Sequence, residues 1–380
     1  MTRTGSIRVA VVGLGFGADF VPIYLHHPGV EYIAVCDRNE QLLAQIGDKF
    51  GVERRFSRLE DILATDEYDA VHLLTPVALH ADQVVAVLQS GKHCACAVPM
   101  ATTIDDLNRI IAARRQSGKH YMMMETSVYT REFLYVKQLR DEGKLGPITF
   151  LRGAHHQDLE GYPGYWQGYP PMLYITHALS PLLALVDARA SRVHCFGSGQ
   201  LRTDLRGSYD NPYPLETALF RLDGTGLVAE VTMSFFQVAR TYVENFSVYG
   251  ERQGFEWQQF EEEQPALFTL LPYTPGQRGR QTTKARVEIS DRADLLPPEI
   301  ARFTRRTLYD ESDPQRAFPV GDGHGGSHPH LVHEFVQSIL EGRTPAVDVI
   351  TAATWTAPGI CAHESALHDG KQVDIPDFAR

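Results

Sequence analysis

Two side chains that can carry protons, Tyr174 and His177, lie three residues apart in segment 172–181, which reads MLYITHALSP. Residues at i and i+3 share one face of a helix, so a helix here would present both side chains together. A histidine titrates near neutral pH and can act as an acid or a base, and a tyrosine can relay a proton beside it. Spacing alone also fits a core tyrosine and a hydrogen-bonded core histidine, so both interpretations stay open on this pattern.

A glycine turn near the N-terminus predicts a nucleotide cofactor. Residues 13–18 read GLGFGA directly after the apolar run 7–12, which is the G-x-G-x-x-A pattern of dinucleotide-binding folds. The first glycine permits the tight turn, the second lets backbone approach a pyrophosphate, and Ala18 allows a helix to pack closely on the strand. The residues of this turn that we expect at the cofactor are Gly13, Gly15, Phe16 and Gly17.

The choice between NAD and NADP depends on two charged neighbours. A second apolar run, 32–36, ends at Asp37, in the window expected for a carboxylate that binds ribose hydroxyls. That carboxylate repels a 2′-phosphate, so the sequence favours NAD, whereas Arg38 next to it would attract the phosphate and weaken the preference. For the glycine turn itself, the alternative interpretation is that it belongs to another kind of doubly wound domain.

Composition limits the classes of partner. The chain has 380 residues, 43% of them hydrophobic, which is enough for two packed domains. A formal net charge of -11 argues against nucleic acid, and no apolar run reaches the roughly 18 residues that a membrane span needs. The stretch before the first predicted strand is short for a signal peptide, and the five cysteines are scattered, so we expect a cytoplasmic, reduced protein.

The elements that must position these residues follow two patterns. Up to about residue 141, buried strands alternate with amphipathic helices, which predicts a parallel sheet. The strands expected in this part cover 7–12, 32–36, 71–76 and 121–124, and the helices cover 80–91, 105–118 and 133–141.

The pattern changes near Gly146, where short segments begin to alternate in polarity, which predicts an antiparallel sheet with one covered face. Residues 270–320 are rich in Pro, Arg and Asp and predict a long excursion. The strands expected here cover 148–154, 193–197, 216–222, 226–236 and 243–250, and closing helices cover 331–341 and 351–367.

These patterns predict an α/β Rossmann domain over 1–125 and an α+β domain with an open-faced, mainly antiparallel sheet over 126–380. We expect the helices within 331–367 to pack back near the Rossmann domain. Because the open face of such a sheet is a common interface, we also expect a homo-oligomer, a dimer or a tetramer, formed through that face.

The glycine turn, the Thr75-Pro76-x-x-x-His80 segment, the turn at 91–93 and the antiparallel sheet together resemble the Gfo/Idh/MocA oxidoreductase family over nearly the whole chain. The resemblance implies NAD bound to the Rossmann domain and a sugar or cyclitol as the small-molecule substrate. Besides the turn, Asp37 and Arg38, the residues expected at the cofactor are Thr75, Pro76, His80, Val98, Pro99 and Glu125. The alternative for Glu125 is that its carboxylate lies in solvent and does not contact the cofactor.

The chain departs from ordinary members of that family at two positions. Val98 stands where they carry a lysine before the proline, and Leu173 stands where they carry an aspartate four residues before the histidine. The Tyr-x-Thr-His motif is similar instead to the NAD-dependent glycosidase branch, best known for α-N-acetylgalactosaminidases. Segments 123–129, 155–159 and 323–326 are also similar to that branch. Ala97 and Thr126 replace a glutamate and an asparagine of the branch, which argues against an identical substrate.

The resemblance implies a glycoside hydrolase that works by an internal redox cycle. Hydride leaves a ring carbon, the neighbouring carbon-2 proton is removed, the leaving group departs, water adds, and the hydride returns. Tyr174 and His177 would transfer protons, with Tyr129 as a third polar group. A dehydrogenase that releases NADH, and a sugar or cofactor sensor without catalysis, stay open as alternatives. The residues expected at the substrate are His155, Asp158, Trp166 and His324.

Four histidines between positions 324 and 333 suggest a metal site, because imidazoles are good zinc ligands. Pro329 marks a helix start among them, however, and no cysteine is near. We therefore expect no metal there and assign His324, on its glycine-rich loop, to the substrate.

Overall fold

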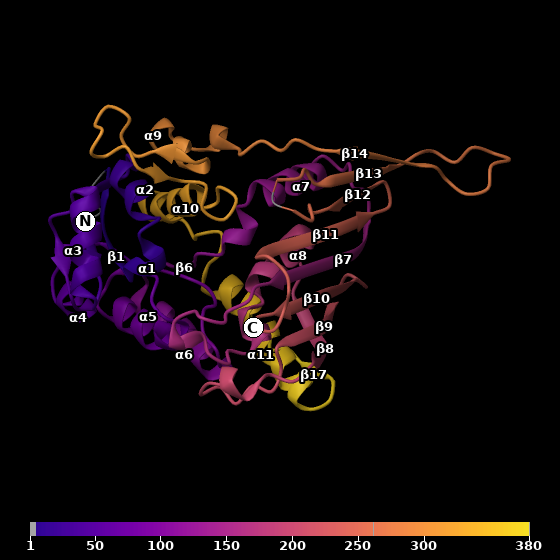
Figure 1. Cartoon of the computed structure of the whole chain (residues 1–380), viewed down its shortest axis with the longest axis horizontal. Coiled ribbons are helices and arrows are strands. Elements are labelled where there is room, and N and C mark those ends of the chain that lie inside the picture. Colours follow the sequence, from indigo (N-terminus) through magenta and orange to yellow (C-terminus); the bar gives the residue numbers. More distant parts are fainter. Residues whose placement is uncertain (1–4, 261, 380) are drawn as a thin grey trace. The chain divides into compact units, whose positions relative to one another are not determined.

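The structure, a computed structural model, describes residues 5–260 and 262–379 (Figure 1). The chain divides into two compact units. The first runs to Arg131 and also takes in Asp291–Ala353, and the second comprises Glu132–Ser290 and Thr354–Arg380. The chain therefore crosses between the units three times, whereas the sequence suggested one boundary after residue 125.

The first unit is built on a parallel sheet of six strands in the order β3-β2-β1-β4-β5-β6. The order runs outward in both directions from β1 and β4, which is the switch point where doubly wound folds bind ligands. The strands are β1 (Ile7–Val12), β2 (Val30–Cys36), β3 (Arg55–Phe56), β4 (Ala70–Leu73), β5 (His93–Cys96) and β6 (Tyr121–Met123).

The helices of this unit begin and end at residues suited to those positions. Asn39 accepts the Leu42 N–H at 3.1 Å to start α3 (Glu40–Phe50), and Gly51 ends that helix with φ 71°. The other helices of this unit are α1 (Leu14–Gly17), α2 (Val21–His26), α4 (Leu59–Leu63), α5 (His80–Gln89), α6 (Ile104–Ser117), α9 (Pro298–Ala301), α10 (His328–Glu341) and the start of α11 (Val349–Leu367).

The second unit holds a sheet of nine strands in the order β14-β13-β12-β11-β7-β10-β9-β8-β17. Only β7 and β10 pair in parallel, so the expected mainly antiparallel sheet is confirmed. The strands are β7 (Ile148–His156), β8 (Ala190–Ser198), β9 (Leu215–Leu222), β10 (Val228–Ser234), β11 (Val243–Gly250), β12 (Gln253–Glu256), β13 (Ala266–Leu270), β14 (Thr282–Arg286) and β17 (Val373–Asp374).

Part of the expected excursion over 270–320 is regular structure. Strand β14 lies within it and pairs with β13, forming the extended hairpin drawn in orange at the end of the sheet in Figure 1. The β-branched Thr282 and Thr283 favour a strand, but the many charges and prolines around them hid that signal.

One face of this sheet is covered by helices. Helices α7 (Arg131–Asp141) and α8 (Thr176–Val186) pack on it, and a Cβ added at Gly153 of β7 would lie 2.1 Å from the Ala178 carbonyl oxygen. Helix and strand can therefore approach this closely only because residue 153 is glycine. On the opposite face, Phe196 of β8 is 55% exposed and Leu219 of β9 is 50% exposed, which leaves that face open.

Within the described residues, no helix combines the length and apolar character that a membrane span requires. All five cysteines are buried free thiols.

Candidate active site

The glycine turn of the first unit has the geometry that a dinucleotide needs. Gly13 has φ 90°, and a Cβ there would lie 2.5 Å from the Leu74 carbonyl oxygen, so only glycine fits. A Cβ at Gly15 would meet no described atom within 4 Å, so the backbone faces open space that a pyrophosphate can enter. Gly17 packs against Leu74, with 3.1 Å from its Cβ position to Cδ1. The residues present therefore fit a bound dinucleotide.

The helix expected after this turn is shorter than the pattern suggests. Helix α1 ends at Gly17, and α2 starts at Val21, with Pro22 in its first turn. Because a proline has no N–H and fits best at a helix start, it favours a new helix rather than a continued one. The N–H groups available to a phosphate therefore come from one short turn.

Asp37 at the end of β2 is oriented by two backbone amides. Its Oδ2 accepts the Leu14 N–H at 2.7 Å, and its Oδ1 accepts the Asn39 N–H at 2.8 Å. A carboxylate oxygen can accept more than one hydrogen bond, so both oxygens can still accept from ribose hydroxyls. Arg38 beside it is exposed.

His80 joins the two loops that follow β4 and β5. Its Nδ1 lies 2.8 Å from the Pro99 carbonyl oxygen and its Nε2 lies 2.9 Å from that of Thr75. Burial lowers the pKa of His80, although both hydrogen bonds oppose that shift. A neutral imidazole has one N–H, so one nitrogen donates in a given tautomer, and the ring links the backbone at Thr75 and Pro76 to Pro99. Val98 presents a buried apolar side chain.

The histidine loop packs against the glycine turn within this unit. The His324 ring lies edge-on to Phe16, with 5.3 Å between centroids, and its Nδ1 lies 3.2 Å from His328 Nε2. The His328 ring stacks on Phe20 at 4.2 Å. The structure therefore places His324 beside Phe16 of the turn.

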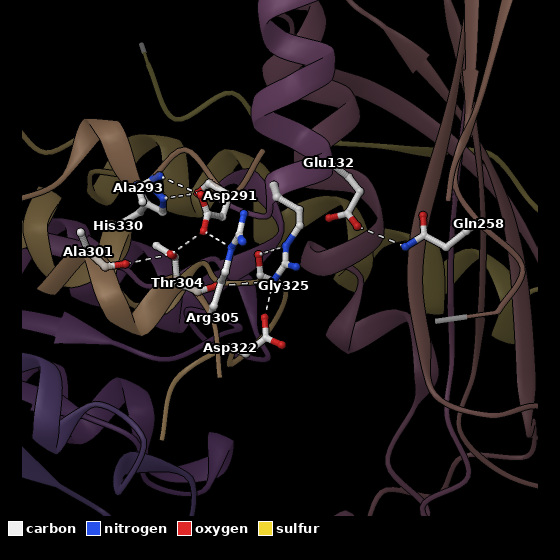
Figure 2. Close-up of polar contacts among 11 residues, drawn as sticks. Glu132, Gln258, Asp291, Ala293, Ala301, Thr304, Arg305, Asp322, Gly325 and His330 are labelled. Atoms are coloured by element: carbon white, nitrogen blue, oxygen red, sulfur yellow. Dashed lines mark hydrogen bonds and ion pairs between the residues drawn. The ribbon is translucent and has the colours of Figure 1, made fainter. Parts of the chain in front are cut away.

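A polar network fixes the segment that carries this loop (Figure 2). The Asp291 carboxylate accepts hydrogen bonds from Ala293 N–H at 3.3 Å and Thr304 Oγ1 at 3.0 Å, and it also binds the Arg305 guanidinium. Arg131 pairs with Asp322, and its Nε donates to the Gly325 carbonyl oxygen at 3.2 Å. These contacts hold the glycine-rich segment 321–326 against the rest of the first unit.

Glu125 and Tyr129 follow β6 in the same unit. Glu125 is buried, and its Oε1 accepts the Ser127 N–H at 3.0 Å, which caps the 3₁₀ turn Thr126–Val128. The Tyr129 ring stacks on His330 with 6.4 Å between centroids, and burial raises the pKa of its hydroxyl. Glu125 is therefore a buried residue, not a solvated one.

In the second unit, Tyr174 and His177 lie together, although not within one helix as the spacing predicted. Tyr174 ends a 3₁₀ turn, Pro171–Tyr174, and His177 lies in the first turn of α8, with 5.1 Å between the ring centroids. A buried carboxylate, Glu216, stabilises this junction by accepting the Met172 N–H at 2.9 Å and contacting His363 Nδ1 at 2.7 Å. The helix thus begins after Tyr174 rather than before it.

His155 and Trp166 join this pair. The His155 ring lies 5.9 Å from that of His177, and Trp166 lies 5.2 Å from Tyr174. Burial lowers the pKa of His155 to about 4, although the charge of Glu244 opposes that shift. His155 is therefore neutral at pH 7, and its Nε2 lies 3.1 Å from Gln157 Oε1.

Glu244 and Tyr242 complete the cluster, and the sequence reasoning missed both. Glu244 Oε1 lies 3.6 Å from His177 Nε2 and also accepts the Tyr242 hydroxyl. Within β11, Glu244 shares a face with the buried Phe246 and Val248. A charge on the apolar side of a predicted strand was the signal that could have identified it.

Asp158 lies in an exposed turn, where its Oδ1 accepts the Glu160 N–H at 3.0 Å. Across the described ranges, no group of three or more His, Cys, Asp or Glu side chains is arranged to hold a metal ion.

Fold and site together define an NAD-binding oxidoreductase scaffold joined to a second α+β unit. Residues 7–125 match the family model "Oxidoreductase family, NAD-binding Rossmann fold" (GFO_IDH_MocA), which confirms that resemblance and the NAD cofactor. Residues 313–380 match the model "Glycosyl hydrolase 109, C-terminal domain". The chain thus carries the Rossmann domain of the first family and a C-terminal domain of the glycosyl hydrolase 109 branch.

Whole-chain relatives agree with this assignment. A glycosyl hydrolase family 109 protein of Saccharopolyspora erythraea is 26% identical over 99% of this chain and 84% of its own length. Another, from Shewanella pealeana, is 29% identical over 100% of this chain and 86% of its own length. Among solved structures, levoglucosan dehydrogenase in complex with NADH and L-sorbose has the same fold, with a TM-score of 0.75 and 19% identity over 99% of this chain and 100% of that one.

Proposed function

We propose that this chain is an NAD-dependent enzyme acting at a sugar ring hydroxyl, and that it is a glycoside hydrolase whose oxidation and reduction cancel within one cycle. The observation that carries the proposal is the Tyr174–His177–Glu244 cluster, which supplies acid–base groups to a chain that also has an NAD-binding Rossmann domain. The two glycosyl hydrolase family 109 relatives support the hydrolase assignment.

The first unit supplies the cofactor site. Bound NAD provides an acceptor for a sugar hydride and later a donor of the same hydride. Asp37 orients the ribose, the glycine turn accommodates the pyrophosphate, and Val98 contributes an apolar wall in place of an ionisable side chain. The full proposed set is Gly13, Gly15, Phe16, Gly17, Asp37, Arg38, Thr75, Pro76, His80, Val98, Pro99 and Glu125, with His80 acting through the loops it joins.

The second unit supplies most of the side chains that we propose for proton transfer and substrate binding, and Tyr129 and His324 are the two proposed residues that belong to the first unit. His177 exchanges a proton with the sugar, and the nearby negative charge of Glu244 stabilises its protonated form. Tyr174, in ring contact with His177, relays a proton to or from it, and Tyr129 is proposed as the third polar group. His155, Asp158, Trp166 and His324 are proposed to bind the substrate, with His155 neutral and therefore limited to hydrogen bonding.

A glycoside panel tests the proposal. The purified protein should release sugar from at least one nitrophenyl glycoside without added cofactor, and mass spectrometry of the denatured protein should detect co-purified NAD. His177→Ala should lower the rate by about 100-fold or more, the usual scale for a lost general acid or base. Steady NADH production with an intact glycosidic bond would instead identify a sugar dehydrogenase, and binding without turnover would identify a sensor.

We also propose a cytoplasmic location and a homo-oligomer, a dimer or a tetramer. The buried free thiols support a reducing compartment. Exposed Phe196 and Leu219 on the open face of the sheet support association through that face. Light scattering on Phe196→Glu and Leu219→Glu variants, which should shift the protein to a smaller species, tests the oligomer.

A further inference from the structure

The segment that follows β7 carries two exposed aromatic side chains, Tyr162 and Tyr165, which are 50% and 43% exposed. The segment is anchored at both ends. Leu159 is buried and its N–H donates to the Phe235 carbonyl oxygen at 2.8 Å, and Tyr169 is also buried. Between these anchors, the Tyr209 hydroxyl donates to the Tyr165 carbonyl oxygen at 3.2 Å. The two tyrosines are therefore presented by an ordered platform.

A chain of ring contacts links this platform to the buried cluster. The Tyr165 ring lies 5.6 Å from that of Trp166, and Trp166 lies 5.2 Å from Tyr174. Tyr174 in turn contacts His177 at 5.1 Å. A line of aromatic side chains thus runs from the candidate proton-transfer pair to the surface.

A second, polar chain reaches the same platform. The Tyr162 hydroxyl accepts from Gln157 Nε2 at 3.1 Å, and Gln157 Oε1 lies 3.1 Å from His155 Nε2. His155 belongs to the buried cluster, with its ring 5.9 Å from His177. Both exposed tyrosines therefore connect to the cluster, one through ring packing and one through hydrogen bonds.

The chemistry of this surface fits a carbohydrate ring. A hexose offers an apolar C–H face that packs on aromatic rings and equatorial hydroxyls that bond to polar groups. Tyr162 and Tyr165 supply rings, and the exposed Asp158 and Glu160 supply acceptors. Arg202 pairs with Glu160 at 2.9 Å and also with Asp204, so its positive charge is already matched by carboxylates and the surface disfavours an anionic sugar.

We infer that Tyr162 and Tyr165 form a second sugar-binding subsite, which takes a further neutral hexose ring joined by the glycosidic bond to the ring that reacts. The inference rests on the proposed function and narrows it: the substrate is an oligosaccharide or a glycan end, rather than a glycoside of a small alcohol.

Calorimetry on the full chain saturated with NAD tests the subsite. The probes are methyl glycosides of galactose, glucose and their N-acetylamino forms, each compared with neutral disaccharides that carry the same non-reducing ring. A disaccharide should bind about 10-fold more tightly than its methyl glycoside, the scale of one good aromatic contact. Tyr165→Ala and Tyr162→Ala should remove that gain and leave the affinity for the methyl glycoside within about 2-fold.

Two controls separate a subsite from a structural effect. Tyr165→Phe keeps the ring and should keep the gain, and Tyr273→Ala removes a tyrosine that is 59% exposed elsewhere in the second unit and should change nothing. Equal affinity for both kinds of probe, or a gain that survives both alanine variants, would overturn the inference while the proposed function stands. If the protein binds none of these sugars, both the second subsite and the proposed function would be overturned.

Discussion

The Nε2 atom of His177 lies 3.6 Å from the Oε1 atom of Glu244, although helix α8 and strand β11 contribute them from distant parts of the chain. Both side chains are largely buried, at 4% and 10% exposure, so water screens their interaction poorly. Glu244 also contacts the Tyr242 hydroxyl, which fixes the orientation of the carboxylate. The Glu244 carboxylate is therefore placed to act as a counter-charge for the His177 imidazole ring.

Replacing this carboxylate should change the titration of His177. In Glu244→Gln the imidazolium loses its counter-charge, so the pKa of His177 should fall. Histidine-selective NMR titration, with the His177 signal assigned through a His177→Asn variant, measures the shift directly. In the pH profile of kcat/KM, the limb governed by His177 should move to lower pH.

Glu256→Gln is the matched control for this shift. Glu256 lies on the same sheet and accepts a tyrosine hydroxyl, from Tyr249 at 2.8 Å, so the variant removes an equivalent charge from an equivalent contact. It should leave the His177 titration unchanged. An unaltered His177 pKa in Glu244→Gln, or the same shift in both variants, would contradict the assigned role of Glu244.

Cofactor selectivity should depend on Asp37. NAD should bind more tightly than NADP, because the Asp37 carboxylate accepts ribose hydroxyls and repels a 2′-phosphate. Asp37→Ser should weaken the binding of NAD and strengthen the binding of NADP, so the ratio of the two affinities should fall by about 10-fold or more. Calorimetry with both cofactors on stripped protein measures this, and Arg38→Ala is the companion variant, which should weaken NADP alone. Tighter NADP binding to the unaltered protein would show that Arg38 decides the preference.

Val98→Lys should not restore activity. Val98 is 5% exposed in an apolar setting, so an ammonium group there carries a desolvation cost. If protons move through Tyr174 and His177, the added lysine should leave turnover of a nitrophenyl glycoside unchanged or lower it, whereas Val98→Met should be close to neutral. A clear gain in dehydrogenase activity with Val98→Lys would favour a degenerate dehydrogenase.

Asp291 should stabilise the first unit in a pH-dependent way. Burial opposes ionisation, but hydrogen bonds from Ala293 N–H, Thr304 and Arg305 outweigh it and lower the pKa of Asp291. A depressed folded-state pKa gives stability that is present at neutral pH and lost as the pH falls through that pKa. Asp291→Asn should therefore cost about 1–3 kcal/mol near pH 7 and progressively less in acid.

Chemical denaturation of both proteins across the pH range measures that difference. The control is Asp294→Asn, whose carboxylate is 63% exposed in its pair with Arg292 and should contribute little. A stability difference for Asp291→Asn that stays constant with pH would show that charge is not the cause.

The sequence predicted the parts of the fold that local pattern controls. The glycine turn, the buried strands after it and the polarity alternation of β9 and β10 each reflect which neighbours a residue has along the chain. Helices within 331–367 were expected near the Rossmann domain, but the chain returns to the first unit already at Asp291, and β14 lies inside the expected excursion; both depend on contacts between distant segments, which local pattern does not report.

The residues of the candidate site also fall into those that the sequence predicted and those that only the tertiary structure shows. Tyr174 and His177 were found because they are neighbours along the chain, and the structure brings their rings together. Glu216, which holds the start of that segment, and Glu244 come from other strands, so only the tertiary structure shows their contacts.

One measurement tests the central claim most directly: the fate of the ring hydrogens during turnover in heavy water. A redox cycle that takes its hydride from carbon-3 removes the hydrogen of the neighbouring carbon-2 and replaces it from solvent, but returns the carbon-3 hydrogen as the stored hydride. NMR of the released sugar should therefore show deuterium at carbon-2 and none at carbon-3, with no net NADH absorbance. Sugar released with protium at carbon-2, or NADH that accumulates while the glycosidic bond stays intact, would contradict the account.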